Sequence, residues 1–184
     1  MTTIAYKDGV MAGDRQLQSG DTRVGETTKV FKLSTYHSTL SLKISGRVYP
    51  VSSWKKPLRD KDWKHQVLLG VSGSCSAITA MILAYNAGAL VNDDGVLQVP
   101  DVPTKDWCLL AVFQSADAAA PWTYRPDDGW SRVEVDTYTA IGSGSVFAVA
   151  AMDFGADAES ALKYAATRDL QTGCGVDVVR FGDN

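Results

Sequence analysis

The sequence contains few of the residues that build disulfide frameworks and metal sites. Among its 184 residues are three cysteines and two histidines. The cysteines, Cys75, Cys108 and Cys174, are odd in number and lack Cys-x-x-Cys spacing, and His37 and His65 lie far from any cysteine pair. This pattern argues against a disulfide-stabilised secreted domain and against a zinc site. We therefore expect reduced thiols, a cytoplasmic location, no metal and no cofactor.

The chain also lacks long apolar runs and an excess of positive charge. No run approaches the roughly 18 apolar residues that indicate a membrane span. The first residues do not combine a charged region with an apolar stretch, so we expect no signal peptide. The formal net charge is −3, which argues against a nucleic-acid partner for the chain as a whole. These absences, with a length that suits one domain, predict a globular protein without a membrane partner.

Several catalytic signatures are missing. The patterns G-x-S-x-G, H-E-x-x-H and G-x-x-x-x-G-K-[ST] do not occur. Asp127 and Asp128 are adjacent carboxylates, but they belong to a Pro-Asp-Asp-Gly turn signal with no matching pair elsewhere, so we expect them to face solvent. The sequence gives no reason to expect an α/β-hydrolase, a zinc protease or a P-loop nucleotide-binding protein.

The most informative feature that is present is the amino terminus. Removal of Met1 would leave Thr2 with a nucleophilic hydroxyl and a free α-amine, whose ordinary pKa is about 8. A threonine hydroxyl activated by an N-terminal amine is a known catalytic arrangement. Lys29 would supply positive charge that lowers the pKa of the amine, and Asp14 would keep Lys29 charged and oriented.

Six segments, in the right order and at about the right spacing, resemble proteasome β subunits and HslV-like peptidases, which are N-terminal nucleophile hydrolases. The resemblance covers nearly the whole chain apart from residues around 34–64. The segments are Thr2-Thr3-Ile4, Ala12-Gly13-Asp14-Arg15-Gln16, Lys29, Val67-Leu68-Leu69-Gly70-Val71-Ser72-Gly73, Ala140-Ile141-Gly142-Ser143-Gly144, and Arg168-Asp169-Leu170-Gln171-Thr172-Gly173.

This resemblance implies a role for each matching residue. Catalytic roles fall on Thr2, Asp14, Lys29, Gly70, Ser143, Asp169 and Thr172, with the Gly70 amide as oxyanion donor and Thr172 in place of the family's serine. Substrate contacts fall on Thr27, Leu68 and Ser72. Because Leu68 matches a position near the specificity pocket, the resemblance suggests apolar side chains before the cleaved bond.

The resemblance also implies a fold and partners. The fold would be α+β, a four-layer αββα sandwich in a single domain spanning residues 1–184. The activity would be that of a threonine endopeptidase acting on polypeptides inside a chamber of self-assembled rings. We expect six- or seven-membered rings, stacked in pairs, and the compartment implies an ATPase unfoldase as a partner.

Two other functions and several structural roles remain open at this point. The chain could be an N-terminal nucleophile amidohydrolase that acts on small amides, or a catalytically silent structural or assembly ring protein. Gly70 could serve close strand packing, and Ser143 could cap a helix. Asp14 could cap a turn, and Lys29 could be a solvated strand lysine.

Hydrophobic periodicity and turn signals predict the secondary structure. Lys7-Asp8-Gly9 and Ser45-Gly46 are hairpin turn signals. Predicted helices span 77–89, 145–152 and 157–169, the last capped by Asp157. Predicted strands span 2–6, 10–12, 27–33, 40–44, 47–51, 66–71, 108–113, 122–125, 133–141 and 176–181.

Residues 34–64 form an insertion relative to the family pattern. They carry seven basic and two acidic residues, whereas the rest of the chain carries eleven basic and nineteen acidic residues. Four aromatic residues are interleaved: Tyr36, Tyr49, Trp54 and Trp63. Such a segment can dock an acidic partner or nucleic acid, but we expect an inserted basic and aromatic hairpin that packs against a neighbouring subunit.

Overall fold

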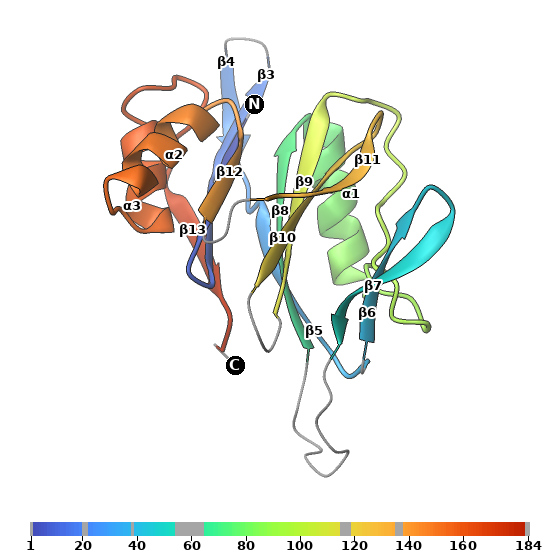
Figure 1. Cartoon of the computed structure of the whole chain (residues 1–184). Coiled ribbons are helices and arrows are strands. Elements are labelled where there is room, and N and C mark those ends of the chain that lie inside the picture. Colours follow the sequence, from blue (N-terminus) through green and yellow to red (C-terminus); the bar gives the residue numbers. More distant parts are fainter. Residues whose placement is uncertain are drawn as a thin grey trace.

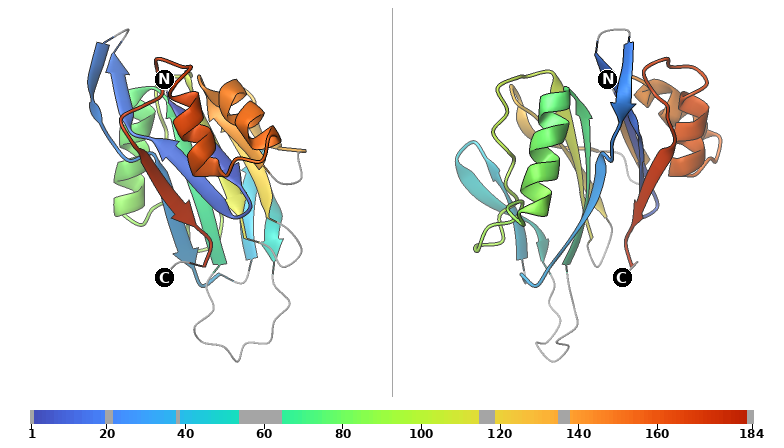
Figure 2. Two further views of the ribbon diagram at one scale, coloured as in Figure 1. Left: turned by 90° about the vertical axis from the view of Figure 1, so that its left-hand side faces the viewer. Right: turned by 180° about the vertical axis from the view of Figure 1, so that it is seen from behind.

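Two β-sheets pack face to face and are covered on their outer faces (Figures 1 and 2). The computed structural model describes residues 2–19, 22–37, 39–53, 65–114, 119–134 and 138–182. The first sheet has the order β12-β1-β2-β13, with bounds Tyr138–Gly142, Thr3–Lys7, Val10–Asp14 and Val176–Arg180. The second has the order β11-β10-β9-β8-β5, with bounds Gly129–Arg132, Ala120–Arg125, Trp107–Phe113, His65–Gly73 and Val30–Thr35. All neighbouring strands are antiparallel.

The outer layers differ in composition. Helices α2 (Ser145–Asp153) and α3 (Ala158–Ala165) cover the first sheet, through an alanine-rich core cluster. Helix α1 (Cys75–Asn86) covers the second sheet, together with the hairpin of β6 (Thr39–Ile44) and β7 (Arg47–Ser53). A further hairpin joins β3 (Gln16–Ser19) to β4 (Thr22–Glu26). The predicted α+β, four-layer αββα sandwich is confirmed.

Alternation of side chains along the strands explains the layers. In β1, Ile4 and Tyr6 belong to the core between the sheets, whereas Ala5 packs against α2 and α3. In β8, Leu68 faces the first sheet, and its neighbours Val67 and Leu69 face the α1 side. Successive side chains of a strand point to opposite faces, so strands buried on both faces must be apolar throughout.

Both predicted hairpin turns are present. Asp8 and Gly9 have φ values of 49° and 80° between β1 and β2, and Ser45 and Gly46 have values of 48° and 81° between β6 and β7. Two consecutive residues with positive φ give the turn whose twist matches antiparallel strands. The β1–β2 turn sets the register that pairs Ile4 with Gly13, which brings the start of β1 beside the end of β2.

Two predicted elements differ clearly in extent from the structure, and one hairpin of the structure was not predicted. Within the strand predicted over 133–141, the described residues form β12 over Tyr138–Gly142, whereas the preceding strand β11 ends at Arg132 and belongs to the other sheet. The helix predicted to reach Asp169 ends at Ala165. After it, the Thr167 and Arg168 amides donate to carbonyls three residues earlier, and the Asp169 carboxylate accepts a hydrogen bond from Ser143. The β3–β4 hairpin was not predicted.

The insertion contributes to the chain's own core. Leu40 and Leu42 of β6 are fully buried and pack in the cluster beneath α1. Tyr49 of β7 is 42% exposed. The hairpin predicted within 34–64 is therefore present over β6 and β7, with one apolar face turned inward. Trp54, Trp63 and most of the lysines of the insertion lie outside the described residues, so packing against a neighbouring subunit stays a prediction.

Candidate active site

Thr2, Asp14 and Lys29 meet at one end of the space between the sheets. The Thr2 hydroxyl donates to Asp14 Oδ1 at 2.8 Å and accepts a hydrogen bond from Lys29 Nζ. Lys29 Nζ also lies 3.2 Å from Asp14 Oδ2 and donates to the Gln16 carbonyl at 2.5 Å. All three predicted site residues are at most 1% exposed. The sequence prediction that they act together therefore corresponds to direct contacts.

Backbone bonds hold this cluster in place. The Thr3 amide donates to Asp14 Oδ1 at 2.8 Å, and the Gln16 amide donates to Asp14 Oδ2 at 3.0 Å. The Lys29 carbonyl accepts from the Val71 amide at 3.0 Å, which fixes the lysine just before β5. Burial lowers the pKa of Lys29, and the neighbouring Asp14 carboxylate opposes that shift. A fully buried lysine whose ammonium contacts a hydroxyl and a carboxylate is a candidate for chemistry as well as for structure.

A second cluster joins the three other predicted catalytic residues that carry side chains. Ser143 Oγ and Thr172 Oγ1 each donate to Asp169 Oδ2 at 2.6 Å. The Ser143 amide donates to the Thr2 carbonyl at 3.2 Å, so this cluster adjoins the first. Burial raises the pKa of Asp169, but hydrogen bonds from Ser143, Thr172 and the Gln171 amide outweigh it, and the net shift is downward.

Thr3 links the two clusters and was not assigned a role from the sequence. Its hydroxyl lies 2.6 Å from Thr172 Oγ1 and accepts from the Gly144 amide at 2.8 Å. Thr3 and Thr172 are 169 residues apart, and nothing in the local pattern pairs them. The repeated Thr-Thr at the amino terminus was the one available signal.

Gly70 and Leu68 lie away from these clusters, which does not fit the roles predicted for them. Gly70 is inside the sheet, opposite Val30 on one side and Leu110 on the other. A Cβ at Gly70 would lie 2.4 Å from Ile4 Cγ2, so the absence of a side chain serves close packing of the two sheets. Leu68 is fully buried in the same core. Both residues are buried between the sheets.

The backbone amide of Gly73, at the end of β8, is better placed than that of Gly70 to donate a hydrogen bond to a group outside the sheet. Amides along a central strand alternate between its two edges. The Val71 amide points toward β5, where it donates to Lys29, so the Gly73 amide points to the same edge. Because β5 begins at Val30, opposite Gly70, no strand residue lies opposite Gly73 on that edge. The second glycine of the Gly70-Val71-Ser72-Gly73 segment could have indicated this alternative.

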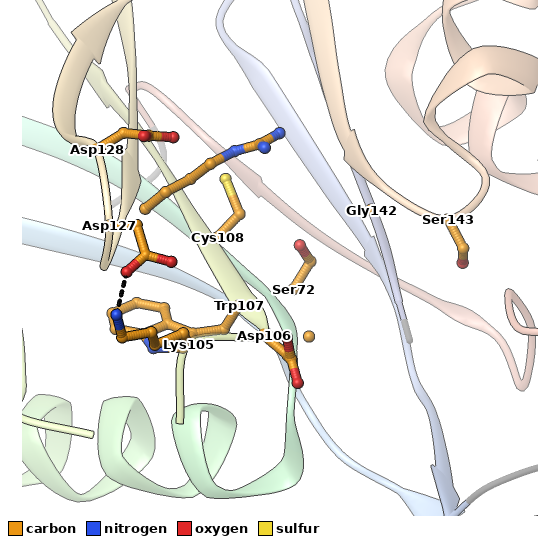
Figure 3. A pocket seen from close by; sticks show the side chains of 11 residues that line it. Ser72, Lys105, Asp106, Trp107, Cys108, Asp127, Asp128, Gly142 and Ser143 are labelled. Carbon is orange, nitrogen blue, oxygen red and sulfur yellow. Dashed lines mark hydrogen bonds and ion pairs between the residues drawn. The ribbon is translucent and has the colours of Figure 1, made fainter. Parts of the chain in front are cut away.

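A pocket of about 430 Å³ opens beside Gly73 and Ser143 (Figure 3). Ser72, predicted to contact substrate, is in its wall although only 3% exposed. Thr27, also predicted to contact substrate, is not in the wall, and its amide donates to the Arg15 carbonyl at 2.9 Å. The lining residues are Ser72, Gly73, Lys105, Asp106, Trp107, Cys108, Arg125, Asp127, Asp128, Gly142 and Ser143.

Within the described ranges, no three histidine, cysteine, aspartate or glutamate side chains are grouped so that they could hold a metal ion. The described helices include none that is long and apolar enough to cross a membrane.

The αββα fold is shared with solved structures of an ancestral beta-subunit and of a protein bound to epoxomicin. No protein-family model and no curated protein sequence matches the chain. Solved structures do. Anbu (ancestral beta-subunit) from Yersinia bercovieri has a TM-score of 0.62 at 10% identity, over 98% of this chain and 81% of that chain.

Two further structures agree. A Gly-1 mutant of Anbu from Hyphomicrobium sp. strain MC1 has a TM-score of 0.63 at 12% identity, over 98% of this chain and 81% of that one. BPH from Thiobacillus denitrificans, solved in complex with epoxomicin, has a TM-score of 0.52 at 16% identity, and the match covers 99% of each chain. At these identities the likeness establishes the shared fold.

Replacing Asp169 with asparagine tests the second cluster through stability. Its pKa in the folded protein lies below the ordinary value of 3.8, so its contribution to stability is present above that value and is lost as the pH falls through the folded-state pKa. We expect Asp169→Asn to unfold at a lower temperature than the wild type at pH 7, with the difference shrinking as the pH falls below 3.8. Thermal melts across pH measure this, with the exposed Asp93→Asn as control. A difference that is the same at every pH would contradict the assignment.

Proposed function

We propose that this chain is a threonine-type peptidase whose nucleophile is Thr2, exposed by removal of Met1. The observation that supports it best is the buried contact of the Thr2 hydroxyl with both Asp14 and Lys29. Burial of a hydroxyl group costs free energy unless the hydroxyl forms hydrogen bonds inside the protein. The Thr2 hydroxyl forms them with the Asp14 carboxylate and the Lys29 ammonium. Methionine removal is consistent with the small side chain of Thr2.

The proposed reaction uses groups already in contact. The Thr2 hydroxyl attacks the carbonyl carbon of a peptide bond, and the freed α-amine of Thr2 accepts the proton. Lys29 stabilises the developing negative charge on Thr2 Oγ1, and its charge lowers the pKa of the amine. The amine then protonates the leaving nitrogen, and an ester between Thr2 and the acyl part of the substrate remains. Water hydrolyses that ester and restores the hydroxyl.

We assign the oxyanion donor to the Gly73 amide in place of Gly70. The support is the direction of that amide, toward the edge of β8 where Lys29 lies. Removing one donor of this kind typically lowers the rate by about 10²–10³. Ser143, held by Asp169 and bonded through its amide to the Thr2 carbonyl, positions the amino-terminal residue.

Assembly is part of the proposal. We propose homo-oligomeric rings of six or seven copies, stacked in pairs, with polypeptide substrates delivered by an ATPase unfoldase in the cytoplasm. Support comes from the likeness in fold to a protein whose name describes an ancestral beta-subunit. Exposed apolar side chains on the α2 and α3 side, including Phe154 at 94% and Leu170 at 92%, offer surface that assembly would cover.

A substrate panel separates peptidase activity from the two other functions. Fluorogenic peptides, an unfolded protein and small acyl amides are incubated with the native protein, and product formation is followed by fluorescence and mass spectrometry. We expect cleavage of the peptides and the unfolded protein. Turnover of small amides alone would identify an amidohydrolase on the same fold, and no turnover of any substrate would favour a structural ring protein.

A further inference from the structure

Five of the eleven residues that line the pocket beside Gly73 and Ser143 are charged. Most of them come from two loops, the residues just before β9 and the turn between β10 and β11, and Arg125 is the last residue of β10. Figure 3 shows Lys105 and Asp127 joined to each other, with Asp106 near Ser72 and Asp128 on the β10–β11 turn. The charged residues are Lys105, Asp106, Arg125, Asp127 and Asp128. A pocket that adjoins the reacting groups and carries charge selects for charge in what fills it.

The charges in the pocket do not cancel. Lys105 and Asp127 form an ion pair with each other, so that pair is neutral as a unit. In the described part of the chain, Asp106, Asp128 and Arg125 make no ion pair within 4.0 Å. Arg125 lies beside the thiol of Cys108. Burial raises the pKa of this thiol, although Arg125 opposes the shift, so the thiol is neutral at pH 7 and does not neutralise the charge of Arg125. Two carboxylates against one guanidinium leave a net negative pocket.

The uncharged part of the pocket wall comes from backbone and small side chains. Trp107 is a lining residue, but its indole belongs to the core cluster beneath α1, is 6% exposed and donates to the Thr104 carbonyl at 3.0 Å. Gly73, Cys108 and Gly142 complete this part of the wall. Lysine and arginine side chains combine an apolar stem with a charged end. A wall of uncharged groups with two carboxylates that make no ion pair among the described residues fits such a side chain.

We propose that this pocket binds a lysine or arginine side chain of the substrate next to the cleaved bond, held by Asp106 and Asp128. The proposal rests on the peptidase function for the meaning of the cleaved bond, and the binding itself does not require turnover. It replaces the apolar preference suggested by Leu68, because Leu68 lies in the core between the sheets and lines no part of the pocket. Arg125 opposes the bound cation and limits the affinity.

Equilibrium binding tests the proposal without requiring turnover. Thr2→Ala protein, which cannot form the acyl-enzyme, is titrated with fluorescein-labelled peptides that differ only in carrying lysine, glutamine or glutamate at one position. That position is scanned along the peptide, and fluorescence anisotropy gives Kd. At one position or more, we expect the lysine peptide to bind about three- to tenfold more tightly than the glutamine peptide, the range expected for partly exposed charge pairs. The advantage should shrink as salt rises.

Four variants give expected changes of different sign. Asp106→Asn and Asp128→Asn should each reduce the advantage of the lysine peptide about threefold, whereas Arg125→Gln should increase it. Asp93→Asn removes a carboxylate that does not line the pocket and should leave the advantage unchanged. Equal binding of lysine and glutamine peptides at every position, a preference for glutamate, or no binding of any peptide would overturn the proposal.

Failure of this proposal is distinguishable from failure of the proposed function. Covalent labelling of wild-type Thr2 by an epoxyketone reports on the nucleophile and does not require a basic residue. Labelled Thr2 with no lysine preference would leave the proposed peptidase function standing and would overturn the binding of a cationic side chain in the pocket. Lysine-dependent binding with unlabelled Thr2 would support the pocket as a binding site and overturn the peptidase.

Discussion

Thr2→Ala is expected to abolish peptide cleavage while the fold remains intact. The substitution removes the hydroxyl that contacts Asp14 and Lys29, but alanine is also small enough to allow removal of Met1. We expect kcat/KM to fall by about 10⁴ or more, as for other hydrolases that lose their nucleophile. Peptide hydrolysis measures the loss, and circular dichroism and native mass spectrometry measure fold and assembly.

Two companion variants make this result specific to the Thr2 hydroxyl. Thr2→Ser keeps a hydroxyl at the same position and should retain cleavage. Thr167→Ala removes an exposed threonine hydroxyl that donates to the Tyr164 carbonyl, and it should cleave at the wild-type rate. Cleavage by Thr2→Ala at more than a few per cent of the wild-type rate would place the nucleophile elsewhere.

Lys29→Ala is expected to lose activity by orders of magnitude and also to lose stability. Activity falls because the Thr2 hydroxyl loses its cationic partner and the pKa of the amine rises. Stability falls because Asp14, 1% exposed, would keep a buried charge with no cation beside it. Breaking a buried ion pair in this way typically costs about 3–5 kcal/mol. Denaturant melts and peptide hydrolysis measure the two effects.

The double variant Lys29→Ala with Asp14→Asn separates these two effects. It removes both charges, so it should recover part of the lost stability without recovering activity. Lys29→Arg should not restore activity, because a planar guanidinium does not replace the compact ammonium within a fully buried site. Wild-type cleavage by Lys29→Arg would show that the ammonium of Lys29 is not part of the site.

The sequence was most informative where short-range rules determine geometry. Asp8 and Gly9 predicted the β1–β2 turn, and that turn fixes the register that carries Asp14 back to the beginning of β1. The contact between Thr2 and Asp14 is therefore a local consequence of one hairpin. The Ser45-Gly46 turn was predicted by the same rule, and the cap at Asp157 was predicted from its position before α3.

The sequence was least informative where a role depends on which face or edge a residue presents. Gly70 and Gly73 lie three residues apart in one strand, and only the register with β5 shows that Gly70 is inside the sheet and Gly73 is past its end. Leu68 is one of several apolar residues in a strand buried on both faces, so alternation could not show which core it joins. The charged pocket is formed by strands and loops of both sheets that sequence patterns do not bring together.

Mass spectrometry of the native protein, before and after treatment with an epoxyketone, tests the central claim most directly. The claim is that Met1 is removed and that the exposed Thr2 supplies both hydroxyl and amine. The account predicts an intact mass without Met1 and an adduct mapped to Thr2, absent from Thr2→Ala. A protein that retains Met1, or one whose Thr2→Ala variant is labelled as fully as the wild type, would contradict it.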